Sequence, residues 1–473
     1  MTTHTKFISS QGYSILKNSL TEKDIKNIKN DLTVTPYIPK DYSIGEAQSF
    51  QIYQEGPKKL YVPKFYGLSK FGPPDICRSS DGYVIDVPFM GSLRNEQLPA
   101  IDAFMKTISD PHKTGGLLNL TCASGKTVMA IYLICTLKRK SLVIVHKDFL
   151  LQQWKERIQQ FAPSARIGLL KAKIIDVEDK DIIIASLQSL SMKDYHPDVL
   201  NGCGFVIVDE CHHTSAEVFS RALRKVAFKY TLGLSATIKR KDGLSKVFKW
   251  YLGDVIYSNV NNKNIDTVDI HCRYFYEPDI SYSKEVYMMG KKLNMAKMIN
   301  NICEYTPRID YIIKEVNNIL QNEPLRKIII LSDRRNHLEF IGNELKKHNI
   351  EYGFYFGGMK QDDLKESESK QILLGTFCMV SEGFDCKSLD TLILASPKSD
   401  VVQSVGRILR EEANNRRHVP LVIDIIDNFS VFKKQAQKRI KYYKSQKYNI
   451  SGLEVVNDNK CIKLDTNCII NLE

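Results

Sequence analysis

A series of continuous apolar runs, each about the length of a β-strand and separated by helix-length segments, most constrains the fold of this chain. The runs are SLVIVH (141–146), DIIIASL (181–187), GFVIVDE (204–210) and YTLGLSA (230–236), then KIIILS, YGFYFG, QILLGTF, TLILAS and LVIDIID. Strands that are apolar on both faces are typical of a parallel sheet covered by helices. Because the pattern pauses from about residue 255 to 300 and then resumes, the sequence predicts an α/β chain with two tandem domains.

Changes in local composition suggest where the parts begin and end. Residues 1–90 are rich in Tyr, Pro and Gly, with short alternating runs between turn residues, which predicts a small N-terminal accessory domain of mainly short strands. The two α/β domains are expected over 91–255 and 301–448, joined by an interdomain linker over 256–300. Residues 449–473 are expected to form a C-terminal tail. A chain of 473 residues is longer than one core usually supports, which agrees with several domains.

The overall composition indicates a basic globular protein. Lys and Arg number 67 against 54 Asp and Glu, a net charge of +13, which favours an acidic partner, most commonly nucleic acid. No apolar run approaches the roughly 18 residues that cross a bilayer, and the polar start lacks a signal pattern, so we expect an intracellular protein without a membrane partner. The 11 cysteines include no C-x-x-C pair, which favours reduced thiols over disulfides or structural zinc.

One segment has most of the features of a phosphate-binding loop. In LLNLTCASGKTVMAIYLI (117–134), an apolar run is followed by Gly125, Lys126 and Thr127 and then by a helix-like stretch. A helix N-terminus, a lysine for the β and γ phosphates and a hydroxyl for Mg²⁺ together suit a bound triphosphate. The first glycine of the full pattern is replaced by Leu120. The triplet alone is equally compatible with an ordinary turn that carries an exposed lysine.

A pair of carboxylates at the end of another apolar run favours the phosphate-loop interpretation. In VIVDECHH, Asp209 and Glu210 follow the strand directly. At the carboxyl end of a strand beside the phosphate-loop strand, one carboxylate can hold Mg²⁺ through water and its neighbour can polarise the attacking water. An acidic surface turn is the alternative for the pair alone. Together with the Gly-Lys-Thr triplet, the pair predicts an ATPase.

Read in order, these motifs resemble those of superfamily 2 helicases and translocases, the DEAD/DEAH-like group. The resemblance covers roughly residues 90 to 430, with the motifs in the family's order. They are LRNEQ (93–97), TCASGKT (121–127), IVHKDFLLQQW (144–154), ASLQSL (185–190), DECH (209–212), SAT (235–237), IIILSDRRNHLEF (328–340), GTFCMVSEGFD (375–385) and QSVGRILR (403–410). The resemblance implies two RecA-like domains with ATP and Mg²⁺ in the cleft between them.

The resemblance also implies roles for individual residues of the first domain. Gln97 would read the adenine, and Lys126 and Thr127 would hold phosphates and Mg²⁺. Asp209 would hold Mg²⁺, with Glu210 as the base that orients water. The full set expected to bind the cofactor is Gln97, Ser124, Gly125, Lys126, Thr127, Gly383 and Asp385, with Thr127 and Asp209 as metal ligands.

In the second domain, Gln403, Arg407 and Arg410 match the family's Q-x-x-G-R-x-x-R motif. The two arginines would reach the γ-phosphate, where a cation arriving on closure stabilises charge in the transition state. Arg407 and Arg410 are expected to share one face of a helix. Three further positions match coupling or nucleic-acid contact sites: Ser235, Thr237 and Thr376. Gly383 and Asp385 match the motif at the seam between the domains.

Several positions depart from the family pattern. Leu120 and Ala123 replace loop glycines, which affects backbone freedom more than charge, so phosphate binding is still expected. GLSATIKRKDGLSKVFKWYLGDVIY and QSVGRILR resemble the XPB-like group of duplex DNA translocases. That group often has Arg-Glu-Asp where this chain has Arg240, Lys241 and Asp242, so the triplet's role in duplex opening is left open. The whole pattern resembles XPB-like helicases of large DNA viruses, whose poxvirus relatives act in transcript release.

The expected function is that of an ATP-dependent DNA helicase or translocase, in viral transcription or in DNA repair or replication. The alternatives are an RNA helicase, an ATP-dependent nucleic-acid clamp or virion assembly factor, and the motor of a restriction enzyme. The expected partners are nucleic acid, DNA rather than RNA, and transcription machinery, with a monomer in the host cytoplasm or the virion. Residues 294–316 predict a helix on the second domain. The basic, aromatic run 433–448 predicts either nucleic-acid contact or a solvated helix face.

Overall fold

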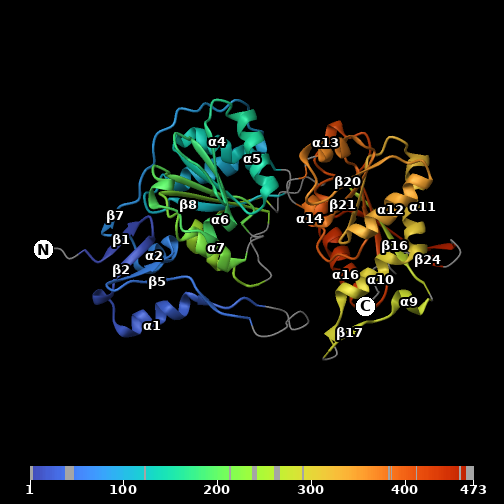
Figure 1. Ribbon diagram of the computed structural model, residues 1–473, viewed down its shortest axis with the longest axis horizontal. Helices are drawn as coiled ribbons and strands as arrows, with labels where there is room; N and C mark the ends of the chain where they lie inside the picture. The colour runs from blue at the N-terminus through green and yellow to red at the C-terminus, as the bar shows by residue number, and fades with distance from the viewer. Residues whose placement is uncertain are drawn as a thin grey trace. The chain divides into compact units, whose positions relative to one another are not determined.

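The computed structural model describes residues 4–37, 47–121, 124–211, 215–236, 242–259, 267–277, 279–289, 292–381, 384, 386–411, 413–456 and 460–464. The chain divides into two compact units, Met1–Asn262 and Lys263–Glu473 (Figure 1). Each unit is built on its own eight-stranded sheet. In the described part of the chain, no helix has the length and apolar character needed to cross a bilayer.

The large sheet of the first unit has the strand order β11-β10-β12-β9-β13-β14-β8-β15. All neighbours are parallel except β10 and β11. The strands are β8 (Gly115–Asn119), β9 (Ser141–Val145), β10 (Ile167–Lys171), β11 (Ile174–Asp176), β12 (Ile182–Ser186), β13 (Phe205–Val208), β14 (Tyr230–Ser235) and β15 (Val255–Ser258). The central strands β9, β12 and β13 are buried at every residue, so the predicted parallel sheet is confirmed.

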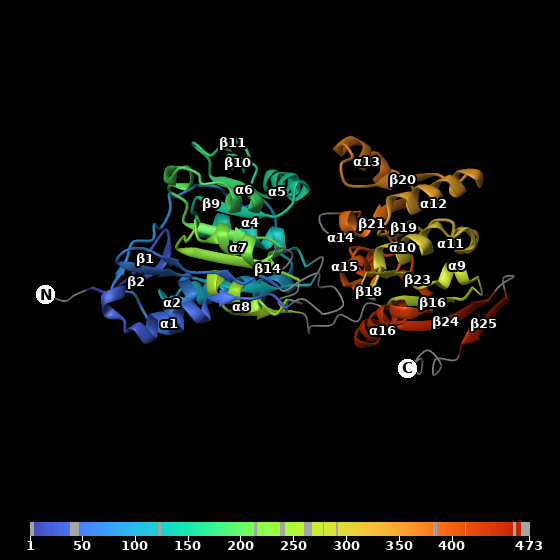
Figure 2. The ribbon, with the colours of Figure 1, turned by 60° about the horizontal axis from the view of Figure 1, so that its bottom comes forward.

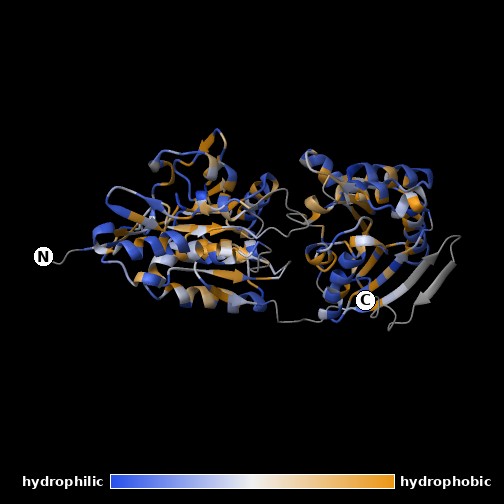
Figure 3. Ribbon diagram, turned by 90° about the horizontal axis from the view of Figure 1, so that it is seen from below, coloured by the Kyte–Doolittle hydropathy of each residue, from blue (hydrophilic) through white to orange (hydrophobic). Residues whose placement is uncertain are grey.

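Helices cover both faces of this sheet because each has an apolar side. In α5, for example, Leu150, Leu151, Trp154 and Ile158 recur at helical spacing and are all buried. Figure 3 shows the hydrophobic residues concentrated on the central strands of the unit. The helices are α3 (Leu98–Ile108), α4 (Lys126–Leu137), α5 (Asp148–Phe161), α6 (Leu187–Met192), α7 (Ala216–Leu223) and α8 (Ser245–Leu252).

The strand order corrects one expectation. Strand β14 lies between β8 and β13, so the strand that precedes Asp209 is not beside the phosphate-loop strand. Apolar runs predict strands but carry no information about which strands are neighbours, because pairing depends on contacts far apart in the chain. The carboxyl ends of all three strands still meet at one edge of the sheet.

The N-terminal region adds a five-stranded sheet with the order β5-β6-β2-β1-β7. Its elements are β1 (Lys6–Ser9), β2 (Gly12–Leu16), α1 (Glu22–Asp31), β3 (Thr33–Val34), β4 (Phe50–Gln51), β5 (Gln54–Glu55), β6 (Lys59–Val62), α2 (Lys64–Phe71) and β7 (Ile76–Cys77). The short strands agree with the sequence, and two helices accompany them. Tyr66 of α2 packs edge-on against Trp250 of α8, with ring centroids 5.3 Å apart. Residues 1–90 therefore share a hydrophobic core with the first large sheet.

The sheet of the second unit has the order β20-β21-β19-β22-β23-β16-β24-β25, with only β25 antiparallel to its neighbour. The strands are β16 (Asp269–Phe275), β19 (Ile328–Ser332), β20 (Tyr352–Tyr355), β21 (Ile372–Thr376), β22 (Thr391–Leu394), β23 (Leu421–Asp427), β24 (Asn449–Val456) and β25 (Lys460–Leu464). The helices are α9 (Ile280–Ser283), α10 (Met295–Glu304), α11 (Thr306–Asn322), α12 (Arg335–Lys347), α13 (Gln361–Ser369), α14 (Phe377–Ser381), α15 (Val402–Val405) and α16 (Ser430–Ser445). A hairpin of β17 (Tyr287–Met288) and β18 (Lys292–Leu293) precedes α10.

This sheet includes residues that the sequence assigns to the linker and the tail. Strand β16 lies between β23 and β24, so residues 269–275 and 449–456 belong to the second sheet rather than to a linker and a tail. The sequence DIHCRYF does not read as a buried strand because Arg273 interrupts it. Arg273 is nevertheless buried, since its Nε lies 2.9 Å from Oε1 of Glu315 on α11.

The helical prediction for 294–316 is confirmed, with a break. Two helices, α10 and α11, occupy this region, and α11 begins with Pro307 in its first turn. Their buried residues, including Met298, Ile302 and Ile312, pack against one face of the second sheet. Figure 2 shows these helices and α16 on opposite sides of the strands.

Candidate nucleotide-binding site

The phosphate-loop motif connects β8 directly to α4. Gly125 is the N-cap residue of α4 and has φ +77°, which favours glycine. A Cβ at this position would lie 2.2 Å from Nε2 of Gln97, so a side chain here would displace the Gln97 amide from its contact with the loop. Leu120 is a buried residue whose amide donates to the carbonyl of Ser235 over 2.9 Å. The position at which the full motif has its first glycine therefore lies just after β8, where a buried leucine packs in the core. Ala123, the other departure from the motif, lies outside the described residues.

Gln97 packs against the phosphate loop. It is 3% exposed, and its Nε2 donates to the carbonyl of Ser124 over 2.9 Å. Its Oε1 accepts from the amide of Arg94 over 2.9 Å, which fixes the side chain from the other end. Gln97 thus fixes the loop backbone, and its expected contact with adenine remains a prediction.

Lys126 and Glu210 contact each other across the site. Lys126 begins α4, and its Nζ pairs with Oε1 of Glu210, the second residue after β13. Their side chains are 11% and 16% exposed, so the pair is largely shielded from solvent. Glu210 has φ +46°, a left-handed backbone that costs a non-glycine residue roughly 1 to 2 kcal/mol. Such strain is typical of functional sites, where a side chain must point in one direction.

Asp209 is the buried member of the carboxylate pair. Trp154 of α5 donates from Nε1 to Oδ2 of Asp209 over 2.8 Å. Burial and, to a smaller extent, the neighbouring Glu210 carboxylate raise the pKa of Asp209, Lys126 and the Trp154 hydrogen bond oppose the shift, and the net pKa is about 6. Trp154 belongs to a quoted motif, but the sequence gives it no role. A tryptophan on an amphipathic helix looks like any core residue until its partner is known.

The oxygen ligands around the loop suit Mg²⁺. A hydroxyl from Thr127 and a carboxylate from Asp209 are hard ligands, which Mg²⁺ prefers. Among the residues that the structure describes, no group of three or more His, Cys, Asp or Glu side chains could hold a metal ion.

The arginine motif of the second unit is only partly helical. Gln403 lies on α15, which ends at Val405, so Arg407 and Arg410 do not share a helix face as predicted. The chain turns here through tight bonds such as Arg407 N to Ser404 O, 3.1 Å. Arg407 is 5% exposed and donates from Nη1 to the carbonyl of Phe384 over 2.9 Å, whereas Arg410 is partly exposed.

The remaining predicted positions are distributed between the two units. Ser235 ends β14 and is buried, and Thr376 ends β21, paired in register with Ser332 of β19. Thr237, Gly383 and Asp385 lie outside the described residues. The first unit therefore brings together Gln97, Ser124, Gly125, Lys126 and Glu210, with Asp209 beside them.

The basic run 433–448 falls largely on α16. Arg439 and Tyr443 of this helix are buried against Asp424, whereas Lys434 and Lys438 are exposed. Tyr443 is packed in the core and is not available to stack on a base. The exposed lysines agree with both interpretations of this run, so its contact with nucleic acid stays a prediction.

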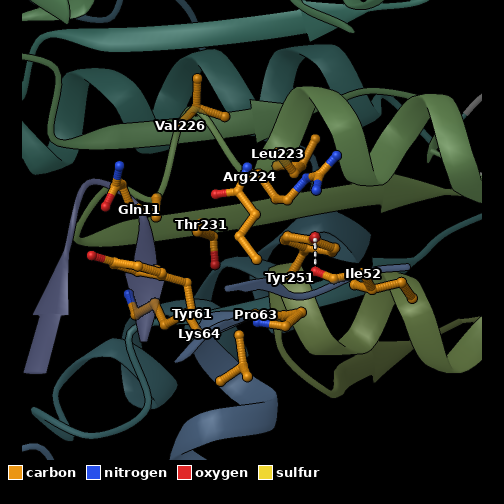
Figure 4. A pocket seen from close by; sticks show the side chains of 14 residues that line it. Gln11, Ile52, Tyr61, Pro63, Lys64, Leu223, Arg224, Val226, Thr231 and Tyr251 are labelled. Carbon is orange, nitrogen blue, oxygen red and sulfur yellow. Dashed lines mark hydrogen bonds between the residues drawn. The ribbon is translucent and has the colours of Figure 1, made fainter. Parts of the chain in front are cut away.

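A cavity elsewhere in the first unit does not contribute to the site. It lies where the N-terminal sheet meets the large sheet, lined by Tyr61, Lys64, Thr231 and Tyr251 among others (Figure 4). Its volume of about 20 Å³ suits a single water and not a nucleotide. Lys64 is buried beside it and donates to the carbonyls of Phe228 and Lys229 over 3.2 and 2.6 Å. Burial lowers the pKa of Lys64 to about 7.

Comparison with known proteins identifies the family. The family model described as "Type III restriction enzyme, res subunit" matches residues 90–240. The chain is 35% identical over 456 residues to "Putative ATP-dependent RNA helicase L396" of Acanthamoeba polyphaga mimivirus, covering 94% of this chain and 86% of the relative. The chain belongs to the superfamily 2 helicases. The predicted family and enzyme class are thereby confirmed: the helicase uses ATP and acts on nucleic acid.

Other relatives of the helicase also come from large DNA viruses. It is 27% identical over 383 residues to "Putative helicase 161L" of Invertebrate iridescent virus 6, covering 76% of this chain and 82% of that protein. It is 25% identical over 474 residues to "Putative ATP-dependent RNA helicase QP509L" of African swine fever virus (isolate Pig/Kenya/KEN-50/1950), covering 93% and 90%. Among solved structures, "The crystal structure of T4 UvsW" matches with a TM-score of 0.33 and 15% identity, covering 92% of this chain and 97% of that one.

Proposed function

We propose that the helicase is a nucleic-acid-stimulated ATPase that moves along or unwinds DNA, with MgATP bound at the loop before α4. The observation that carries the proposal is the contact between Lys126 and Glu210 beside the buried Asp209. These side chains come from two separate places in the chain, the start of α4 and the turn after β13, and they meet at the N-terminus of α4, where the backbone amides have no partner within the helix.

The Lys126–Glu210 pair supports an exchange of partners on nucleotide binding. Lys126 would leave Glu210 for the β and γ phosphates, because a phosphate carries more negative charge than one carboxylate. Glu210 would then accept a hydrogen bond from the attacking water and orient it. Bound Mg²⁺ would neutralise phosphate charge, held by Thr127 and Asp209.

The second unit would supply the cations that complete the site. Arg410 and Arg407 would approach the γ-phosphate when the two units close, and they would move away from it when the units open after hydrolysis. Each cycle would move the protein along the nucleic-acid strand. Arg410 is the better candidate for direct contact, since Arg407 already donates to the carbonyl of Phe384 and is 5% exposed.

The choice of nucleic acid rests on motif details. The stretch after the SAT motif resembles duplex DNA translocases, which favours DNA. RNA is the competing substrate, because two relatives carry the words RNA helicase in their names. We further propose a role in viral transcription, with transcript release as the leading candidate, and action in the host cytoplasm or virion. An ATP-dependent clamp that does not unwind remains the alternative from a different functional class.

Steady-state ATP hydrolysis tests the proposal, measured alone and with single-stranded DNA, duplex DNA or RNA at a fixed low salt. Lys126→Ala should lower kcat about 100-fold or more, because the phosphates lose their main cation, and Glu210→Gln should do the same. Lys155→Ala, on the exposed side of α5, is the matched control and should leave kcat unchanged. Unchanged turnover in Lys126→Ala would contradict the proposed site. Stimulation by RNA alone would move the helicase to the RNA branch.

A further inference from the structure

Strand β23 carries two buried carboxylates near its C-terminal end. Asp424 and Asp427 are 0% and 2% exposed. Side chains alternate along a strand, so residues an odd number apart point to opposite faces. Asp427 accordingly shares its face with Ile425 and the helices α9 and α11, and Asp424 shares the other face with α16.

On one face, Arg308 of α11 holds Asp427. Its Nε lies 2.7 Å from Oδ1 and its Nη2 lies 3.1 Å from Oδ2, a two-pronged pair in which Arg308 is fully buried. Tyr282 of α9 donates its hydroxyl to the same carboxylate. The remaining prong of Arg308, Nη1, donates to the carbonyl of Ala395.

The other face repeats this arrangement with different residues. Arg439 of α16 reaches Asp424 through Nε and Nη2, each over 2.8 Å. Tyr443 donates its hydroxyl to Oδ2 of Asp424 over 3.0 Å. Nη1 of Arg439 donates to the carbonyl of Lys398, so each arginine uses one donor on the same loop.

That loop, residues 395–401, connects β22 to α15 and leads directly into the arginine motif. Asp333 fixes its middle, since the amide of Asp333 donates to Oγ of Ser396 over 2.9 Å and its carboxylate pairs with Nζ of Lys398 over 2.8 Å. The loop is therefore held from both faces of the sheet before it reaches Gln403.

Stability alone does not account for two such buried pairs. Removing two charges from water costs several kcal/mol per ion, and apolar residues of similar volume often stabilise a fold equally well. A buried arginine that binds a carboxylate through Nε and Nη2 still has Nη1 as a donor. Here Nη1 of each arginine donates to a backbone carbonyl of the same loop, and the two carbonyls are three residues apart. The shared target indicates a role in fixing the path of this loop.

We propose that Arg308 and Arg439 are positioning residues for the arginine motif: they fix residues 395–401 from both faces of the sheet, so that Arg410 is presented in one orientation when ATP is hydrolysed. The inference rests on the proposed function, in which Arg410 acts at the γ-phosphate. Lysine cannot replace arginine in this role, because a single ammonium cannot hold the carboxylate with two prongs and also reach the carbonyl.

The test compares Arg308→Lys and Arg439→Lys with Arg273→Lys as the matched control. Arg273 forms a similar, slightly less buried two-pronged pair with Glu315, at 2.9 and 3.2 Å, in which the Arg273 side chain is 10% exposed, and it contacts a helix in place of the loop. All three variants should lower the thermal midpoint by similar amounts. Well below that midpoint, Arg308→Lys and Arg439→Lys should lower the kcat of nucleic-acid-stimulated hydrolysis about tenfold with little change in KM for ATP, and Arg273→Lys should not. An equal loss of kcat in Arg273→Lys would overturn the inference.

A double-mutant cycle with Arg410→Ala separates this inference from the proposed function. If Arg439 acts through Arg410, adding Arg439→Lys to Arg410→Ala should cause no further loss of kcat. Losses that multiply would overturn the positioning role while leaving the proposed function intact. If Arg410→Ala hydrolyses ATP like the unmodified helicase, then the proposed role of Arg410 fails, and the positioning role fails with it.

Discussion

The two sheets present charged residues at their carboxyl edges in different ways. In the first unit, Lys126, Asp209 and Glu210 meet at the edge, and Lys126 pairs with Glu210 where a phosphate is expected. In the second unit, two ion pairs, Arg308–Asp427 and Arg439–Asp424, are buried in the core, and both arginines bond the loop over residues 395–401. In the first unit, the residues expected to contact ATP thus lie at the sheet edge themselves. In the second unit, buried ion pairs fix the loop that leads to the arginine motif.

The backbone conformations of the two sites differ as well. The first unit uses left-handed residues at the site itself, Gly125 at φ +77° and Glu210 at φ +46°. None of the described residues between 395 and 411 has a positive φ. Left-handed backbone conformations therefore orient the side chains of the phosphate-loop site, and ion pairs between distant segments orient those of the arginine motif. Substitutions at the left-handed residues and at the ion-paired residues should therefore have different effects on ATP turnover and on stability.

The largest expected effect is from Gly125→Ala. A Cβ there would lie 2.2 Å from Nε2 of Gln97 and would displace the amide that bonds the loop, and φ +77° is strained for alanine, so ATP turnover should fall about 100-fold. Gly358→Ala in the second unit is the control, because Gly358 also has a positive φ, +91°, but nothing lies within 4 Å of its Cβ position. It should cost about 1 kcal/mol of stability and leave kcat unchanged. Comparable turnover in the two variants would show that the loop tolerates a side chain.

The next effect distinguishes the two arginines of the motif. Arg407→Ala should lower both kcat and the thermal midpoint, because the side chain is buried and bonded to Phe384, with a loss of turnover of about 100-fold. Arg410→Ala should lower kcat as much with a smaller change in the midpoint. ATPase rates and thermal unfolding of both variants measure this. A larger loss of stability in Arg410→Ala would contradict the assignment.

A smaller effect is expected from Trp154→Phe. The change removes the donor that lowers the pKa of Asp209, so that pKa should rise above its value of about 6. If hydrolysis needs ionised Asp209, the acidic limb of kcat/KM should move to higher pH, with a loss of about threefold at pH 6 and less at pH 8. Trp250→Phe, which alters the contacts of this ring with Tyr66 and Lys246, should leave the profile in place.

The smallest effect concerns stability without nucleotide. Asp209 has a pKa of about 6 in the folded state against an ordinary value of 3.8, so between these pH values the folded state binds more protons than the unfolded state and stability falls as pH rises. Asp209→Asn removes this cost and should raise the thermal midpoint by about 2 to 4 °C above pH 6, with the gain vanishing toward pH 4. Thermal melts across this pH range measure the difference. A midpoint that falls at pH 7 would mean that the carboxylate is stabilised by its neighbours.

Much of the first site could be predicted from the sequence because its motifs are local. Gly125, Lys126, Asp209 and Glu210 each follow an apolar run, and the carboxyl ends of parallel strands share one edge of a sheet. Trp154 was missed as a partner of Asp209, because the two are 55 residues apart. The helical placement of Arg407 and Arg410 was wrong, because three-residue spacing cannot show that α15 ends after a single turn.

The α/β class, the helicase family and the residues expected to contact ATP follow from apolar periodicity and short motifs, which are properties of neighbouring residues. The strand order, in which β14 separates β8 from β13 and β16 and β24 complete the second sheet, is known from the three-dimensional fold alone. The convergence of Arg308 and Arg439 on one loop is likewise known from the fold alone. The physical reason is that strand order and buried ion pairs depend on contacts between distant segments, which no local pattern records.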